Sequence, residues 1–379
     1  MWLPFFISKL SDEPCARHAL HALSAVCASD CALSIEAIGQ LPLQICDALH
    51  VPSQLQPARH HALSIFKRIL SAPHVVPHPG SRVVECLVTS VDAERDPRNL
   101  LLVFDLVQIA ASTPNFHPLP SSLVEELFNA TFCYFPIRFK RAASDIGSVS
   151  PEVLSMKLRD ALFSSTAFAP FLYMGLSQRI AADEDDDVIA ALQCLNLSFK
   201  AFPASTLAES CDSLWGTLSH AAVDAASDRV AQACRDCITC LVAAAAATPV
   251  AQALRAHAVS FVSSAIRRPD EDDSRRTFRV FMCVVSAAES SDASADAADA
   301  AAAAVNGVCS SLSDAFLSCG PRPRAQLEVI NMALELAHGL RCVCACVCVC
   351  VCVCVCVCVC VCVCVCVCVC VCVCVCVCV

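Results

Sequence analysis

Residues 96–107 read Asp-Pro-Arg-Asn-Leu-Leu-Leu-Val-Phe-Asp-Leu-Val, and they join a helix start to an apolar helix face. Asp96 can accept hydrogen bonds from the first free backbone amides. Pro97 suits the first helical position because it has no amide hydrogen to leave unpaired. Four apolar residues follow at helical spacing: Leu100, Leu101, Phe104 and Val107. The stretch therefore predicts an amphipathic helix that packs against neighbouring helices.

The same pattern recurs along the chain. Two further starts precede apolar faces: Ser150-Pro151-Glu152 before Leu154, Leu158 and Leu162, and Pro120-Ser121-Ser122 before Leu123, Leu127 and Phe128. Pro203 and Pro249 each end a predicted helix. Other helices are predicted near residues 13–28, 34–49, 56–71, 80–92, 168–181, 188–202, 205–222, 227–247, 251–267, 275–288 and 324–339.

These helices pair at a period near 40 residues without strict sequence repetition, which is typical of HEAT-type repeats. We therefore predict an all-α fold, an α-solenoid of HEAT-type antiparallel helix pairs. Four parts are expected: a HEAT-repeat domain at 1–285, an Ala/Ser/Asp-rich linker or frayed helix at 286–305, a further, truncated helical repeat at 306–341, and a Val–Cys low-complexity tract at 342–379.

The Val–Cys tract holds 19 of the 33 cysteines, with cysteine at every even position from Cys342 and Ala345 in place of one valine. Its alternation could indicate a strand, its hydropathy a membrane span, and its thiols a metal store. An alternating GT nucleotide repeat explains the pattern better, because its successive triplets GTG and TGT encode Val and Cys. We interpret the tract as a translated microsatellite that follows an unrecognised splice donor near Arg341, so that the natural protein continues differently after Leu340.

Composition excludes several functions for the rest of the chain. The net charge is −10 and there are two Tyr and two Trp, so direct binding of nucleic acid is not expected. Eight scattered glycines form no phosphate-binding loop. Cysteines without paired spacing indicate a reducing compartment. The apolar N-terminus lacks a basic region and a cleavage site, and is interpreted as a piece of helix.

The most prominent candidate site is Cys234-x-x-Cys237-x-x-Cys240, because three thiolates at this spacing open many iron–sulfur motifs. The motif lies inside a strongly predicted helix, however. There the outer two cysteines are about 9 Å apart along the axis, too far for one cluster to reach all three. These cysteines are therefore expected to pack in the core.

Two other groups have ligand chemistry. Cys15-x-x-His18-x-x-His21 lies on one predicted helix without a fourth ligand, and is interpreted as a helix surface. The acidic runs 183–187 and 269–273 precede helices, where carboxylates stabilise the positive end of the helix dipole. No catalytic motif is found. We therefore predict a protein that is not an enzyme, with no catalytic residue, cofactor or metal site.

Several segments resemble one family in the correct order. Residues 96–101, Asp-Pro-Arg-Asn-Leu-Leu, and residues 133–137, Cys-Tyr-Phe-Pro-Ile, are similar to two segments of the MMS-nineteen (Met-eighteen) proteins. Three later segments are also similar: Leu158 to Phe171, Ala191 to Leu195, and Ser213-Leu214-Trp215. The resemblance covers roughly Phe5 to Val242. This chain lacks the family's proline-rich loop after Phe139.

The resemblance implies a HEAT-repeat adaptor of the cytosolic iron–sulfur assembly targeting complex, in cytoplasm and nucleus. Such adaptors bind iron–sulfur assembly targeting subunits and present apo-clients, among them DNA repair and replication enzymes, for cluster insertion. The family thereby affects nucleotide-excision repair and transcription. Family members are much longer, and the C-terminal repeats that dock the other subunits are not expected here. The alternative is a nuclear-transport-type HEAT solenoid that binds protein cargo. No nucleic acid or membrane partner is expected.

Overall fold

A computed structural model describes residues 2–29, 39–72, 80–113, 118–138, 149–182, 184–246, 248–266 and 272–290, three single positions (308, 329 and 332), and two short segments of the Val–Cys tract. Apart from these two segments, the regular structure of the described residues is helical. The chain divides into two compact units, Met1–Met174 and Gly175–Val379.

Unit 1 contains the helices α1 (Trp2–Ser8), α2 (Glu13–Ala28), α4 (Leu41–Ala48), α5 (Gln56–Leu70), α6 (Gly80–Val91), α7 (Pro97–Ser112), α8 (Ser121–Phe132) and α9 (Pro151–Leu162), with short 3₁₀ turns at Val51–Ser53 and Thr166–Phe168. α10 (Ala169–Ala182) crosses the division between the units. The apolar N-terminus is indeed helical, as α1.

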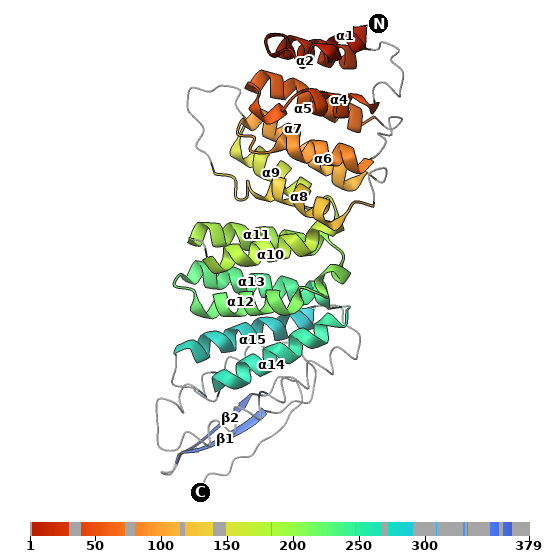
Figure 1. Cartoon of the computed structure of the whole chain (residues 1–379). Coiled ribbons are helices and arrows are strands. Elements are labelled where there is room, and N and C mark those ends of the chain that lie inside the picture. The colour runs from red at the N-terminus through yellow and green to blue at the C-terminus, as the bar shows by residue number, and fades with distance from the viewer. Residues whose placement is uncertain are drawn as a thin grey trace. The chain divides into compact units, whose positions relative to one another are not determined.

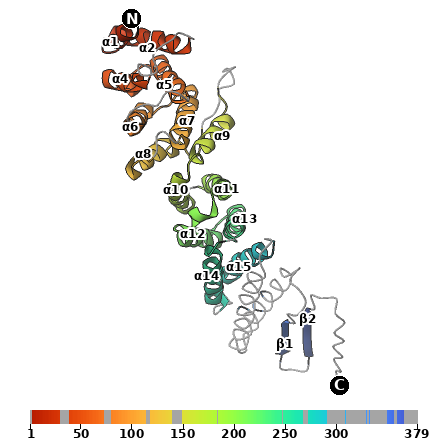
Figure 2. The same ribbon diagram turned by 90° about the vertical axis from the view of Figure 1, so that its right-hand side faces the viewer.

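The helices of unit 1 stack in two rows (Figure 2). In the α5 row, α2, α5, α7 and α9 pack one on the next; in the α6 row, α4, α6 and α8 do the same. Contacts between neighbouring repeats join residues 40 positions apart, as in His21–His61, Cys46–Cys86 and Tyr134–Glu94. The predicted period is therefore confirmed.

The helix that starts at Pro97 shows why this sequence builds a stack. The Asp96 side chain accepts hydrogen bonds from the backbone amides of Arg98 and Asn99, as predicted. Leu100, Phe104 and Val107 are buried, and Leu101, the fourth residue of the predicted apolar face, is half-buried. Because α7 is flanked by α5 and α9, it buries a wider surface than one stripe, which also includes Val103, Leu106 and Ala110.

Unit 2 repeats the arrangement with α11 (Asp185–Ala201), α12 (Cys211–Asp224), α13 (Asp228–Ala245), α14 (Val250–Ile266) and α15 (Asp272–Ser290). α11, α13 and α15 stack in one row, and α12 packs against α13 and α14 (Figure 1). The helix predicted at 205–222 begins as a 3₁₀ turn, Ala204–Leu207, before α12. The predicted helix at 324–339 lies almost wholly outside the described residues, as does most of the predicted linker or frayed helix at 286–305.

Within the Val–Cys tract, β1 (Val349–Val355) and β2 (Val359–Val365) form an antiparallel pair in which Val349 lies opposite Val365. A period-two sequence is compatible with a strand. The proposed origin of the tract in a nucleotide repeat concerns the transcript and stays a prediction. Among the described residues, no helix is both long and apolar enough to cross a membrane.

Candidate functional site: the Glu94 network and the α5 row

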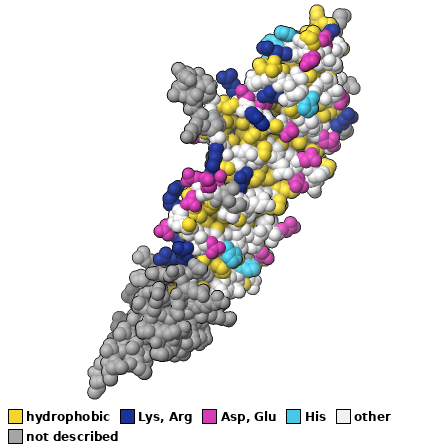
Figure 3. Space-filling view, turned by 60° about the vertical axis from the view of Figure 1, so that its left-hand side comes forward, with side chains coloured by type: hydrophobic (Ala, Val, Ile, Leu, Met, Phe, Trp, Pro, Cys, Tyr) yellow, Lys and Arg dark blue, Asp and Glu magenta, His cyan; other side chains and the backbone are white. Residues whose placement is uncertain are grey.

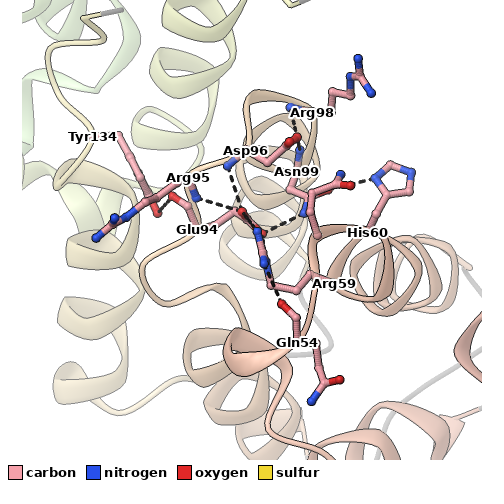
Figure 4. Close-up of polar contacts among 10 residues, drawn as sticks. Gln54, Arg59, His60, Glu94, Arg95, Asp96, Arg98, Asn99 and Tyr134 are labelled. Carbon is pink, nitrogen blue, oxygen red and sulfur yellow. Dashed lines mark hydrogen bonds and ion pairs between the residues drawn. The ribbon is translucent and has the colours of Figure 1, made fainter. Parts of the chain in front are cut away.

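The two segments that resemble the family meet at one buried carboxylate, Glu94, in the turn between α6 and α7 (Figure 4). Arg59 of α5 donates to both carboxylate oxygens, from Nε to Oε2 at 2.8 Å and from Nη2 to Oε1 at 2.7 Å. The same guanidinium donates to the backbone oxygen of Gln54 at 2.7 Å. Glu94 is 4% exposed, so this is a buried, two-point ion pair between repeats.

Three further donors complete the shell of Glu94. The backbone amides of Arg95 and Asp96 donate to Oε1 at 2.9 and 3.0 Å, and Asn99 Nδ2 donates to Oε2 at 2.9 Å. Burial alone raises the pKa of the Glu94 carboxyl, but these hydrogen bonds and that from Arg59 outweigh it and hold the pKa at about 2. Glu94 is therefore ionised at neutral pH and has its charge fully compensated.

The backbone before Glu94 takes an uncommon conformation that allows this geometry. Ala93 has φ 54°, a left-handed value that residues with a Cβ rarely adopt. The turn places the Glu94 carboxylate at the start of α7. There Glu94 accepts from the backbone amide of Asp96, and the Asp96 side chain accepts in turn from the backbone amide of Arg98. The local strain is thus offset by two sets of hydrogen bonds at one helix start.

Tyr134 brings the second family segment to the same place. Its hydroxyl donates to the backbone oxygen of Glu94 at 2.8 Å, and its ring lies edge-on to Phe104 with centroids 5.9 Å apart. Burial raises the pKa of the Tyr134 hydroxyl, which therefore stays protonated as a donor. Phe132 and Phe135 stack on each other on either side of it in sequence. The segment after α8 is thereby fixed to the turn before α7.

The network extends into α5 through Asn99, whose Oδ1 lies 3.0 Å from His60 Nδ1. One set of side chains therefore joins α5, the α6–α7 turn, α7 and the segment after α8. The charged and polar groups at the centre of the network form hydrogen bonds with one another, so the network stabilises the stack of repeats. Sequence reasoning missed Arg59 and Glu94, although their spacing of 35 residues, close to the repeat period, was an available signal.

A second ionic chain runs along the surface of the α5 row. Asp105 of α7 forms ion pairs with Lys67 of α5 and with Lys157 of α9. The Asp105 Oδ1 and Lys157 Nζ atoms are 2.9 Å apart. Burial raises the pKa of the Asp105 carboxyl, but both lysines lower it, and the net shift is downward. Asp105 is 16% exposed, whereas the lysine side chains are 40% and 35% exposed. One carboxylate thus holds two half-exposed ammonium groups across three helices.

The candidate cysteines lie inside unit 2. Cys234 and Cys237 on α13 are fully buried, and Cys240 is half-buried. The Cys237 thiol faces the Leu192 backbone oxygen of α11 at 4.0 Å. Burial raises the pKa of both Cys234 and Cys237, which favours the neutral thiol over the thiolate that a metal requires. The structure thus places them in packing positions; whether the chain binds a metal stays a prediction.

His21, one of the candidate ligands, contacts a histidine of another helix and not Cys15 or His18. Cys15, His18 and His21 all lie on α2, and His21 Nδ1 is 3.1 Å from His61 Nε2 on α5. The two histidines are 40 residues apart in the sequence, which is again one repeat length. Among the described residues, no group of three or more His, Cys, Asp or Glu side chains is arranged to hold a metal ion.

The acidic runs begin helices, as predicted, where the structure describes them. Asp185, Asp186 and Asp187 form the first turn of α11, and Asp272 begins α15. Asp186 lies 3.7 Å from Arg229 of α13, with both side chains exposed. Residues 183 and 269–271 lie outside the described part of the chain.

Comparison with solved structures places the fold. A karyopherin, Kap121p bound to the extreme C-terminus of the phosphatase Cdc14p, has a TM-score of 0.51 at 16% identity, over 89% of this chain and 34% of that chain. The TSC2 N-terminus has a TM-score of 0.54 at 13% identity, over 89% of this chain and 82% of that chain. At these identities the likeness shows the fold alone. The predicted all-α, HEAT-type solenoid is confirmed.

Comparison of sequences identifies the family. The family described as "Dos2-interacting transcription regulator of RNA-Pol-II" (MMS19_N) matches residues 1–224. The "MMS19 nucleotide excision repair protein homolog" of Mus musculus is 30% identical over 232 residues, which are 60% of this chain and 22% of the relative. A relative in Saccharomyces cerevisiae, named as a "DNA repair/transcription protein", is 29% identical over 226 residues, 56% of this chain and 21% of the relative.

The chain spans about a fifth of the length of these curated relatives. The match includes the Glu94 network and all helices of unit 1, and it ends with α12. Since more than half of the sequence is matched, the chain belongs to the MMS19 family and carries its N-terminal region.

Proposed function

We propose that this chain is the N-terminal part of a non-catalytic adaptor of the cytosolic iron–sulfur protein assembly targeting complex. In this role it presents apo-clients, such as DNA repair and replication enzymes, for cluster insertion in cytoplasm and nucleus. The observation that carries the proposal is the family match over residues 1–224. The names of the relatives connect the family with nucleotide-excision repair and transcription.

The geometry supports a holding role. Glu94 and Asp105, whose pKa values are lowered, are both engaged with basic side chains of neighbouring helices. They fix one repeat to the next instead of facing an open cavity as a catalytic carboxylate would. A stack of helix pairs held in this way offers an extended surface to protein partners.

A binding experiment with a purified iron–sulfur helicase tests the proposal. The full chain, kept reduced, is immobilised and exposed to the same helicase in its apo and cluster-loaded forms. An adaptor that acts before cluster insertion should bind the apo form more tightly. Equal binding of the two forms, or no binding of either, would contradict the proposal.

Affinity capture from cells separates the alternative. Enrichment of iron–sulfur enzymes over abundant cluster-free enzymes supports an assembly adaptor. Enrichment of a small GTPase with nuclear-pore proteins would instead indicate a nuclear-transport-type solenoid. The likeness to a karyopherin does not favour that outcome, because at 16% identity it reports only the architecture.

A further inference from the structure

A groove lies along the α5 row, between α2 and α5 and beside α7. It has a volume of about 550 Å³ and is open to solvent. Cys27, Ala28, Ala72 and Leu102 supply apolar lining, while Lys67 and Arg68 supply charge. None of the described residues that line the groove is aromatic. The size and lining suit small apolar side chains that carry a charge of opposite sign nearby.

Two basic side chains, Arg68 and Lys67, lie beside the groove. Arg68 is exposed, and its Nη2 lies 3.5 Å from the Ala28 backbone oxygen on α2, across the groove. Lys67 shares Asp105 with Lys157, so one carboxylate compensates only one of the two ammonium groups. With Arg68, the two lysines supply three cationic groups from α5 to α9, against the two carboxylates of Asp105 and of Asp160, which acts on Lys157.

Beyond Lys157 the surface becomes apolar again. Val153 and Met156 on α9 are 41% and 46% exposed; they lie three residues apart, and Val153 is one helical turn before Lys157. The α5 row thus presents an apolar groove, a basic centre and a second apolar stripe. Figure 3 shows apolar side chains of unit 1 open to solvent between charged ones.

Charge is segregated between the two rows of unit 1. Outside the buried Arg59–Glu94 pair, the helices of the α5 row carry six basic residues (Arg17, Lys67, Arg68, Arg98, Lys157 and Arg159) and four acidic ones (Glu13, Asp105, Glu152 and Asp160). The α6 row carries one basic residue (Arg82) and four acidic ones (Asp47, Glu85, Glu125 and Glu126). This asymmetry, in a chain of net charge −10, distinguishes the α5 row as a surface for an acidic partner.

We propose that the α5 row of unit 1 binds an acidic, extended segment of a partner protein. The carboxylates of the segment pair with Arg68, Lys67 and Lys157, and its apolar side chains enter the groove and cover Val153 and Met156. The alternating apolar and basic surface selects an acidic peptide over nucleic acid. Single strands are bound through stacking aromatics, which the described lining of the groove does not supply. The proposal goes beyond the adaptor function and holds for any client class.

Fluorescence anisotropy with a synthetic peptide tests this surface. The probe is a labelled peptide of repeated Glu-Leu-Asp units, titrated with the full chain under reducing conditions. The Arg68→Glu variant should bind it roughly five- to tenfold more weakly, because the change removes an attraction and adds a repulsion. Arg82→Glu is the matched control: it makes the same charge reversal on the α6 row, and Arg82 is 58% exposed. It should bind as the parent does.

A second variant tests the apolar part without changing charge. Met156→Ser, at an exposed position, should also weaken binding, and circular dichroism should show that both variants keep their helix content. The proposal is overturned if Arg68→Glu and Arg82→Glu bind equally well, if a Gln-Leu-Asn peptide binds as tightly as the acidic one, or if a single-stranded oligonucleotide displaces the peptide at lower concentration than unlabelled peptide does. These outcomes are independent of whether apo-helicase binds.

Discussion

Replacing Glu94 by Gln removes the charge at the centre of the network and keeps the shape of the side chain. The structure gives the size of the effect. The pKa of Glu94 falls from an ordinary value of 4.5 to about 2, and each unit corresponds to about 1.36 kcal/mol. Solvent screening reduces the full value, so the charged form contributes about 2 to 3 kcal/mol. Glu94→Gln should destabilise the α5–α7 region by this amount at neutral pH.

Hydrogen exchange measured by mass spectrometry suits this prediction, because it reports opening of individual helices in a chain of several repeats. Amides of α5 and α7 should exchange roughly 30- to 150-fold faster in the variant, as about 2 to 3 kcal/mol requires. Amides of α13 should not change. Glu125→Gln, on the exposed face of α8 in the same unit, is the control and should leave exchange in α5 and α7 unaltered.

The pH dependence provides a second check with a defined sign. Since the pKa of Glu94 is lower in the folded state, its stabilisation is complete above the unfolded-state value near 4.5 and is lost as pH falls toward 2. The parent should lose stability across this window, and Glu94→Gln should lose less. If the two proteins exchange alike at neutral pH, or if acid destabilises both to the same extent, the network does not hold the repeats together as argued.

Three further predictions concern other parts of the chain. Tyr134→Phe should lower the free energy of unfolding by about 1 kcal/mol, because it removes one part-buried hydrogen bond to the Glu94 backbone oxygen; thermal melting of the variant checks this. Replacing Cys234 and Cys237 together by Ala should cost about 1 to 2 kcal/mol and leave client binding intact, whereas iron in the purified parent, detected by its absorbance, would contradict the packing role. The full chain should aggregate more readily than a version that ends at Leu340, because the tract is uncharged, free of proline and rich in oxidisable thiols; light scattering compares the two, and spliced RNA from the same locus should skip the repeat.

The helices of this chain could be predicted because their starts and faces are encoded locally. Asp96-Pro97 and Ser150-Pro151 cap α7 and α9 as expected, and the apolar spacing placed most helix ends within a few residues. The burial of individual positions was harder to predict from the sequence. Leu101 lies at helical spacing yet is half-buried, because the contacts on both sides of α7 decide which positions are covered.

The candidate site could not be predicted from any one segment. Glu94 precedes the family motif without any pattern of its own, and its partner Arg59 lies one repeat earlier. His21 was considered with residues of its own helix, but its contact is His61. In both cases the partner is about a repeat length away. A search for polar pairs about 40 residues apart would have found both of them.

The Arg59–Glu94 pair and the Lys67–Asp105–Lys157 chain of unit 1 differ in their access to water, and this has a mechanical consequence. The Arg59–Glu94 pair is buried, so dissolved salt screens it little and it acts as a fixed joint. The Lys67–Asp105–Lys157 chain is half-exposed and spans three helices of the α5 row, so it weakens as ionic strength rises. One link between the repeats is thus insensitive to salt, while the link along the α5 row is sensitive to it. We therefore expect the α5 row to become more flexible as ionic strength rises, and an acidic segment that paired with Lys67 and Lys157 to compete with Asp105 for them.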